Sequence, residues 1–230
     1  METREIKIQY LFQSGFSVEI KDRLFIFDYM EGQVDLEDKS TMVFCSHGHL
    51  DHYNTAIFNW QEKKQNIQYI LSDDIMIEQQ KLNICQMSPY DEIQVEDVKI
   101  KAYGSTDMGV SFLVKWAGVT LFHAGDLNWW HWGDDTPEET ERAEKEFKNE
   151  IATIRGEVVD LAFFPVDPRL EDNYSLGADY FIEQIKPKFF IPMHFGEDFK
   201  ISGQYAKKMK GSPTRIILFT EREQEIVLNI

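Results

Sequence analysis

The stretch CSHGHLDHYN, residues 45–54, holds three of the six histidines of the chain, His47, His49 and His52, together with Asp51. Imidazole nitrogens and carboxylates are the ligands that zinc prefers, and iron and manganese also accept them. In extended backbone alternate residues project to the same side, so His47 and His49 can share one ion while Asp51 and His52 reach another. A turn with incidental histidines is the alternative. We therefore expect a metal site whose remaining ligands come from elsewhere in the chain.

The composition is that of a folded protein, with 230 residues, 43% hydrophobic residues and 28% charged residues. This length is sufficient to bury a proper core, and we expect a single domain over residues 1–230. The formal net charge is −16, from 40 acidic and 24 basic residues. Such a charge repels polyanions and does not favour nucleic acid as the principal substrate. A small-molecule substrate is expected instead, and the oligomeric state cannot be read from the sequence.

Cysteine usage and the first residues bear on location. Cys45 and Cys85 are the two cysteines, and their spacing suggests no disulfide framework, so we expect reduced thiols and a cytoplasmic protein. The segment METREIKIQYLF, residues 1–12, is charged from its second residue and has no apolar signal-peptide region. No apolar run approaches 18 residues, so no membrane span is predicted.

Alternating or continuous apolar runs predict strands in most of the first half, and strands alternate with helices later. The expected strands lie within residues 5–12, 16–20, 23–30, 41–46, 67–72, 92–103, 109–118, 119–125, 158–166, 187–196 and 215–220, with a hairpin at 115–118. The expected helices lie near residues 54–64, 134–157, 177–186 and 202–209. The clearest helix has Thr136 as its N-cap and Pro137 at its first position. The pattern predicts a mixed domain with sheets packed inside helices.

Two further candidate ligands follow predicted strands. Asp126 ends the segment HAGD after the strand VTLF, and His194 lies in PMHFG after KFFI. Each residue alone is weak evidence, because an Asp after a strand is usually a cap or part of a turn. Together with the histidine cluster they place polar groups at three apolar strand ends, and such ends often converge on one face.

At this point the chain resembles a known family. HGHLDH matches the HxHxDH motif of the metallo-β-lactamase superfamily. FDYMEG at 27–32, FHAGDLN at 122–128 and FIPMHFG at 190–196 resemble the family segments that carry, in order, an early Asp, the bridging Asp and the last His. Within the superfamily the chain looks closest to the compact ascorbate-phosphate-lactonase-like hydrolases.

The resemblance implies an α+β fold, an αββα sandwich of two mixed β-sheets flanked by helices, with a two-metal site at one edge. By the family pattern His47 and His49 would bind the first ion, Asp51, His52 and His194 the second, and Asp126 would bridge them. The cofactor would be a divalent metal, zinc before manganese or iron, with one or two ions bound. Asp28 and His123 would orient ligands through hydrogen bonds.

The implied reaction is metal-dependent hydrolysis, in which a metal-bound hydroxide attacks a carbonyl or phosphorus centre. Asp51 would steer the water or carry its proton as the catalytic residue. The expected substrate is a small ester, lactone, amide or phosphodiester. The alternatives are a nuclease of the same fold, or a metal-binding protein with little or no hydrolytic activity.

The chain departs from the family pattern where a third histidine normally completes the first metal site. Residues 104–112, GSTDMGVSF, contain no histidine. The first site could be weakened, leaving one ion; Asp107 could serve as a ligand; or His131 could reach the site from the segment NWWHWGDD. The tryptophans of that segment, Trp129, Trp130 and Trp132, would form either a substrate wall or ordinary core packing.

Overall fold

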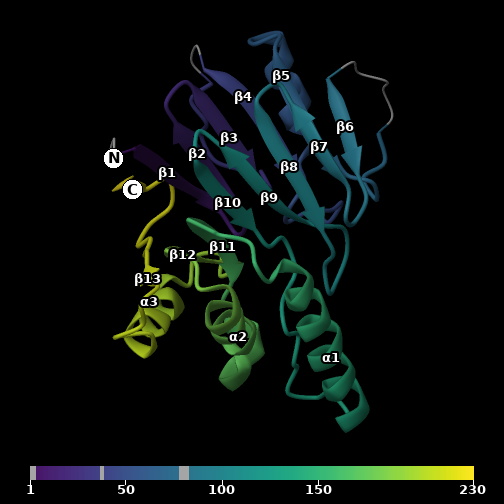
Figure 1. Ribbon diagram of the computed structural model, residues 1–230, viewed down its shortest axis with the longest axis vertical. Helices are drawn as coiled ribbons and strands as arrows, with labels where there is room; N and C mark the ends of the chain where they lie inside the picture. The colour runs from purple at the N-terminus through teal and green to yellow at the C-terminus, as the bar shows by residue number, and fades with distance from the viewer. Residues whose placement is uncertain (1–3, 37–38, 78–82) are drawn as a thin grey trace.

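The computed structural model describes residues 4–36, 39–77 and 83–230, and in these residues two mixed seven-stranded sheets face each other (Figure 1). The first sheet has the order β14-β1-β2-β3-β4-β5-β6 and the second β13-β12-β11-β10-β9-β8-β7. The strands of the first sheet are β1 (Glu5–Phe12), β2 (Gly15–Ile20), β3 (Arg23–Phe27), β4 (Ser40–Cys45), β5 (Ile67–Ser72), β6 (Ile84–Met87) and β14 (Glu225–Asn229). Those of the second are β7 (Glu92–Val95), β8 (Val98–Tyr103), β9 (Ser111–Trp116), β10 (Val119–His123), β11 (Leu161–Pro165), β12 (Phe189–Met193) and β13 (Arg215–Ile216).

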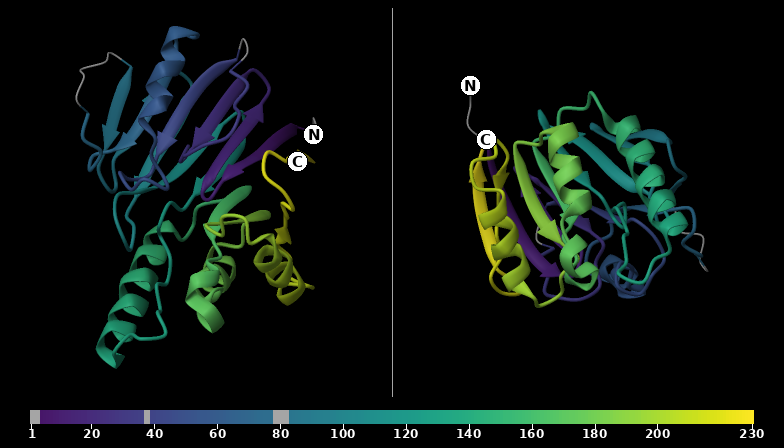
Figure 2. Two further views of the ribbon diagram at one scale, coloured as in Figure 1. Left: turned by 180° about the vertical axis from the view of Figure 1, so that it is seen from behind. Right: turned by 90° about the horizontal axis from the view of Figure 1, so that it is seen from below.

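Helices cover the outer faces of both sheets. The helices α1 (Pro137–Ile154), α2 (Leu176–Ile185) and α3 (Phe199–Lys208) lie together on the side of the second sheet (Figure 2). The 3₁₀ helix η1 (Thr55–Glu62) covers the first sheet, and a second, η2 (Pro168–Asn173), follows β11. None of the described helices has the length and low polarity needed to cross a membrane. The predicted αββα class is confirmed.

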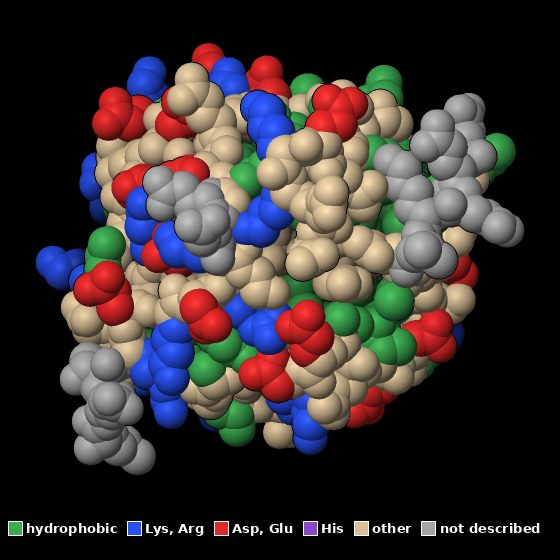
Figure 3. Space-filling model, turned by 90° about the horizontal axis from the view of Figure 1, so that it is seen from above, with side chains coloured by type: hydrophobic (Ala, Val, Ile, Leu, Met, Phe, Trp, Pro, Cys, Tyr) green, Lys and Arg blue, Asp and Glu red, His purple; other side chains and the backbone are tan. Residues whose placement is uncertain are grey.

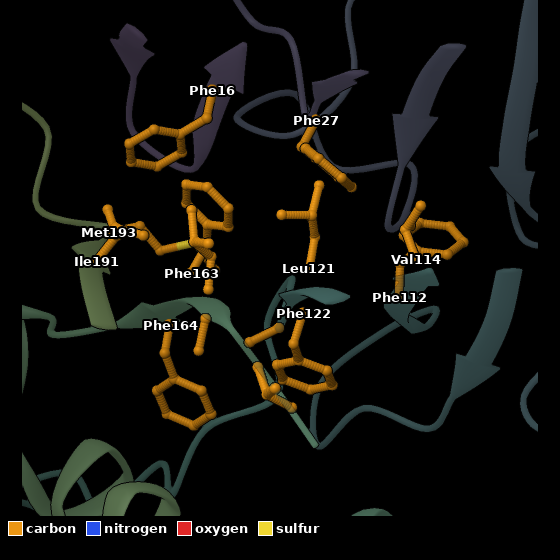
Figure 4. Close-up of a cluster of buried hydrophobic side chains, with 14 of the residues drawn as sticks. Phe16, Phe27, Phe112, Val114, Leu121, Phe122, Phe163, Phe164, Ile191 and Met193 are labelled. Carbon is orange, nitrogen blue, oxygen red and sulfur yellow. The ribbon is translucent and has the colours of Figure 1, made fainter. Parts of the chain in front are cut away.

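Alternation along the strands divides the large residues between two packing layers. Phe16 from β2 and Phe163 from β11 meet between the sheets, with ring centroids 4.7 Å apart (Figure 4). The next residue on β11, Phe164, points the other way and stacks on Phe181 of α2 at 4.6 Å. The strand β11 is therefore buried on both faces, as its continuous apolar sequence predicts.

Four segments differ from the sequence-based prediction. The helix expected over 54–64 is a 3₁₀ helix that begins after the cap Asn54, and it contains β-branched and aromatic residues that favour α-helix weakly. The strand expected over 215–220 ends at Ile216, because the chain then crosses to the first sheet, where Phe219 packs on Phe16 at 5.7 Å. The short edge strands β6 and β14 were not predicted from the sequence.

The topology brings the carboxyl ends of several parallel strands to one edge of the sandwich. In the first sheet β3 and β4 run parallel, and in the second β10, β11 and β12 do so. The chain leaves these strands at residues that the sequence analysis singled out, and at one it did not: Asp28, the segment 46–52, Asp126, Asp167 and His194. The two sheets join here through the His194 N–H, which donates to the carbonyl of Gln13 at 3.0 Å.

Two glycines allow loops to pack directly on the first residue after β4, Ser46. Gly109 has φ of 69°, and a Cβ added to it would lie 2.0 Å from the Ser46 carbonyl oxygen. Gly125 has φ of 53°, and its added Cβ would lie 2.6 Å from the Ser46 Cβ. Positive φ combined with such close approach disfavours a side chain at both positions. The loops that carry Asp107 and Asp126 are thus fixed against the histidine segment.

Replacing Gly109 with Ala should lower the free energy of unfolding by about 2 kcal/mol or more, because it adds backbone strain to a clash with Ser46. Urea denaturation of both proteins measures the difference. Gly203→Ala is the matched control, since Gly203 lies in α3 with open space around it and ordinary φ. That control should be neutral or stabilising by about 0.5–1 kcal/mol. Equal destabilisation by the two substitutions would contradict the close packing at Gly109.

Candidate metal centre

Six side chains from both sheets converge at this edge in two groups of metal-ligand type. In each group the ligand atoms lie within 4.8 Å of one another. The first group contains His47, His49 and Asp126, and the second contains Asp51, His52 and His194. The structure therefore brings together all the residues that the sequence analysis assigned as ligands.

Asp126 lies between the groups and turns one carboxylate oxygen toward each. Its Oδ2 is 3.6 Å from Nε2 of His47. Its Oδ1 is 3.1 Å from Nε2 of His52 and 3.3 Å from Nε2 of His194. A carboxylate placed in this way can serve two cations at once.

Hydrogen bonds behind the rings decide which nitrogen faces the site. The Nδ1 atoms of His52 and His194 donate to buried carboxylates, Asp28 at 2.7 Å and Asp167 at 2.9 Å. The hydroxyl of Ser46 donates to Asp28 at 2.6 Å, so it accepts the hydrogen of His47 Nδ1 at 3.0 Å. In each of the three rings, when it is neutral, the Nε2 lone pair is therefore turned toward the site.

The site contains four buried polar atoms that make no hydrogen bond within the described part of the chain. They are Nε2 of His47, His52 and His194, and Oδ1 of Asp126. Buried polar groups are almost always paired, and orphaned ones at a single point require an explanation. Three imidazole lone pairs and a carboxylate oxygen that face one another form a donor set that fits a divalent metal ion.

Asp28 connects the strand ends beneath the site. The carboxylate is fully buried, and besides the Ser46 hydroxyl and His52 it accepts the Ser46 N–H at 2.7 Å. His123 donates through Nε2 to the Ser14 carbonyl at 2.9 Å, while its Nδ1 accepts the Gly125 N–H at 3.2 Å. Asp28 thus orients a ligand directly, whereas His123 supports the loop that leads to Asp126.

Burial and neighbouring charges act in opposite directions on the titrating groups. Burial alone lowers the pKa of His52, but Asp126 and Asp28 outweigh it and raise that pKa to about 10. Burial also lowers the pKa of His47 and of His123. The carboxyl of Asp126 would have a raised pKa from burial, but the adjacent histidines hold its pKa far below the usual range. Without a metal the carboxylates keep a proton on His52, and a bound cation has to replace it.

Asp167 and Arg169 were not predicted from the sequence as site residues. Asp167 follows β11, is fully buried, and holds His194. Arg169 binds the same carboxylate through Nε at 2.9 and 3.0 Å and through Nη2 at 2.5 Å. The available signal was an Asp after an apolar strand, in FFPVDPR, which is the same type of signal that identified Asp126.

Each group has two buried members and one whose side chain is partly exposed, His49 in the first and Asp51 in the second. The side chain of His49 is 44% exposed and that of Asp107 46%, and His49 Nδ1 lies 3.9 Å from Asp107 Oδ2. Among the described residues Asp107 is therefore the carboxylate nearest to His49 on the side where the family pattern has an imidazole. His131 does not line the site pocket in the described structure, and its carbonyl accepts a hydrogen bond from Asn173.

A pocket of about 460 Å³ opens above the ligands. It is lined by His49, Asp51, Thr106, Asp107, Asp126, Trp130, Trp132, Arg169 and His194. Trp130 and Trp132 stack on each other with centroids 5.8 Å apart and form one wall. Trp129 instead packs against Phe147 of α1. Two of the three tryptophans thus contact the pocket, and the third belongs to the core.

Comparisons with known proteins agree with this architecture. A metallo hydrolase from the archaeon Ignicoccus hospitalis is 15% identical, with a TM-score of 0.72 over 97% of this chain and 98% of that one. The metallo-beta-lactamase fold protein YhfI from Bacillus subtilis is 14% identical, with a TM-score of 0.66 over the whole of both chains. The diiron β-hydroxylase CmlA from Streptomyces venezuelae is 10% identical, with a TM-score of 0.59 over all of this chain and 55% of that one.

At these identities the likeness shows the fold alone. Among curated proteins none matches the sequence. The family model described as the beta-lactamase superfamily domain matches residues 7–194, which contain every ligand candidate named above. The protein therefore belongs to the metallo-β-lactamase superfamily, as the HxHxDH resemblance predicts.

Proposed function

We propose that this protein is a metal-dependent hydrolase of a small ester, lactone, amide or phosphodiester. The observation that carries the proposal is the convergence of four buried, unpartnered donor atoms beside an open pocket. A cation at that point satisfies all four, and the pocket gives a small molecule access to it. Membership of a superfamily whose structural neighbours include a metallo hydrolase supports the assignment.

Two ions would be held unequally. Asp51, His52 and His194 would hold one, and His47 and His49 the other, with Asp126 shared. We assign the higher affinity to the set that contains His52 and His194, because buried carboxylates fix both rings. In the other set, His49 is exposed and lies beside the exposed Asp107. We propose zinc as the metal. Iron and manganese are the alternatives, because the exposed carboxylate of Asp107 suits a harder ion and CmlA is a diiron enzyme.

When bound, divalent ions at such a site lower the pKa of water and stabilise negative charge that develops on the substrate. Asp51 is the residue we assign to proton transfer. Its carboxylate lines the pocket, is 40% exposed, and lies 3.7 Å from Nε2 of both His52 and His194. Gln13 donates to it at 3.5 Å from the β1–β2 turn and limits its rotation. A carboxylate that borders both the ligands and the pocket can accept a proton from water and release it to a leaving group.

The proposal also covers nucleic-acid binding, domain organisation, cellular location and subgroup. A net charge of −16 does not favour nucleic acid, and on the face shown in Figure 3 the described Lys and Arg side chains are interspersed with Asp and Glu. One core cluster contains side chains of both sheets, which supports a single domain over residues 1–230. Free Cys45 and Cys85 support a cytoplasmic location. The similarity to ascorbate-phosphate-lactonase-like hydrolases is retained as a proposal at the level of subgroup.

Metal analysis tests the centre itself. Protein purified without added ions should contain between one and two equivalents of zinc, iron or manganese by mass spectrometry. His49→Ala should lose at most one equivalent, because it affects only the ion held by His47 and His49. His194→Ala should remove the more tightly held ion. A chelator should lower the melting temperature of the wild type, since an ion bound only to the folded state stabilises it. Absence of metal from the intact protein, and no gain on adding these ions, would refute the proposal.

Asp51→Ala should reduce turnover of whichever ester, lactone, amide or phosphodiester the wild type hydrolyses by about 10²-fold or more, because it removes the proton carrier. Metal content is measured alongside, since Asp51 is also a ligand candidate. The matched control is Asp22→Ala, an exposed Asp in the turn between β2 and β3. Wild-type turnover in Asp51→Ala would show that Asp51 is not required. A metal-loaded wild type without activity on the whole panel would favour a metal-binding protein.

Asp167→Asn should weaken the more tightly held ion about 10–100-fold, because an amide no longer fixes the His194 tautomer with a charged acceptor. Competition with a fluorescent zinc chelator measures the affinity. Asp160, which precedes β11 at its other end and accepts the Thr120 N–H, provides the control Asp160→Asn. Similar losses in both variants would mean that the effect is a general one on β11.

A further inference from the structure

We propose that Arg169 is the residue that selects the substrate, and that it binds a terminal oxyanion, a carboxylate or phosphoryl group, located close to the bond that is cleaved. This inference rests on the proposed function, since it assigns a substrate class to the same pocket.

The charges around the pocket single out Arg169. Three of the nine lining residues are carboxylates, Asp51, Asp107 and Asp126, and Arg169 is the only Lys or Arg among the described lining residues. In a chain of net charge −16, a guanidinium at this place gives the pocket its one fixed organic cation. Anionic substrates would otherwise be repelled by the rim, so the Arg169 side chain has a large effect on which molecules enter.

The guanidinium is held in a fixed direction before any ligand arrives. Two of its nitrogens, Nε and Nη2, bind the carboxylate of Asp167, which is fully buried and also accepts from His194. Its Cζ lies 5.7 Å from the ring centroid of Trp132, which in turn stacks on Trp130. An Arg constrained on both sides loses little conformational entropy when it binds a ligand.

One nitrogen remains available for binding. Nη1 of Arg169 makes no hydrogen bond or ion pair within the described part of the chain, and the side chain is 57% exposed. Asp167 engages only Nε and Nη2 of Arg169, so both N–H groups of Nη1 remain available to a ligand. A planar guanidinium with a free N–H pair is suited to carboxylate and phosphoryl oxygens.

The position of Arg169 limits the size of the substrate. Nη2 is 3.3 Å from Nδ1 of His194, whose Nε2 faces the metal centre. The cation and the ligand cluster are therefore separated by about the width of one imidazole ring. A molecule that contacts both must carry its oxyanion only a few bonds from the cleaved ester, lactone or amide. The substrate class is thus a compact organic acid or phosphate derivative.

Equilibrium binding tests the assignment without requiring turnover. Trp130 and Trp132 lie beside Arg169, so ligand binding can be followed by tryptophan fluorescence in protein of measured metal content. The probes are succinate, its neutral diamide and inorganic phosphate. Wild type should bind succinate, phosphate or both, at least tenfold more tightly than the diamide. The anion that binds more tightly shows whether the oxyanion of the substrate is a carboxylate or a phosphoryl group. Arg169→Gln should lose tenfold or more of the affinity for that anion, and Arg169→Lys should retain part of it.

Arg142→Gln is the matched control. Arg142 lines a smaller neighbouring pocket that shares Trp130 and Trp132 but none of the ligand candidates, so this variant should bind the anions like the wild type. If Arg169→Gln binds the anions as tightly as the wild type, or the wild type prefers neither anion to the diamide, the inference is wrong. Equal losses for anionic and neutral probes would also overturn it, because they would show a purely structural role. The metal and turnover measurements decide the proposed function independently of these results.

Discussion

The carboxylate of Asp28 is the group on which the architecture of the centre depends. It is buried at the end of β3 and accepts three hydrogen bonds from β4's continuation, two from Ser46 and one from His52. An unpaired buried carboxylate would be costly, so these bonds fix the backbone after β4 as well as the side chains. Through the Ser46 hydroxyl the same group sets the tautomer of His47. Asp28 thereby orients two candidate ligands, His47 and His52, without being a candidate ligand itself.

The centre has a rigid half and an adaptable half. His52 and His194 each rest on a buried carboxylate, and Asp126 lies between them with little exposure. His49 and Asp107 project toward solvent, nearly half exposed, and among the described residues no buried carboxylate supports them in the same way. The His52 and His194 rings are therefore held in fixed orientations, whereas the side chains of His49 and Asp107 border solvent. The missing third histidine belongs to the adaptable half.

Much of this arrangement could be predicted from the sequence, because its signals are local. The motif HGHLDH and the strand-end residues Asp126 and His194 identify the candidate ligands, and apolar runs identify most strands. Asp167 follows an apolar strand as Asp126 does, but Asp167 and Arg169 were missed because only their contacts with His194, 25 to 27 residues further along the chain, show their place at the site. The strand β14 was missed for a related reason: it is an edge strand whose pairing with β1 joins opposite ends of the chain. Local pattern does not report such long-range pairing.

The candidate ligands come from both layers of the sandwich: His47, His49, Asp51 and His52 follow β4 of the first sheet, and Asp126 and His194 follow strands of the second. A cation bound among them would link the two sheets. Its affinity would then depend on how the sheets pack against each other, and so on the aromatic layer between them, including the contact of Phe16 with Phe163. Core substitutions far from the pocket would therefore alter metal binding, because they change the distance between the candidate ligands of the first sheet and those of the second.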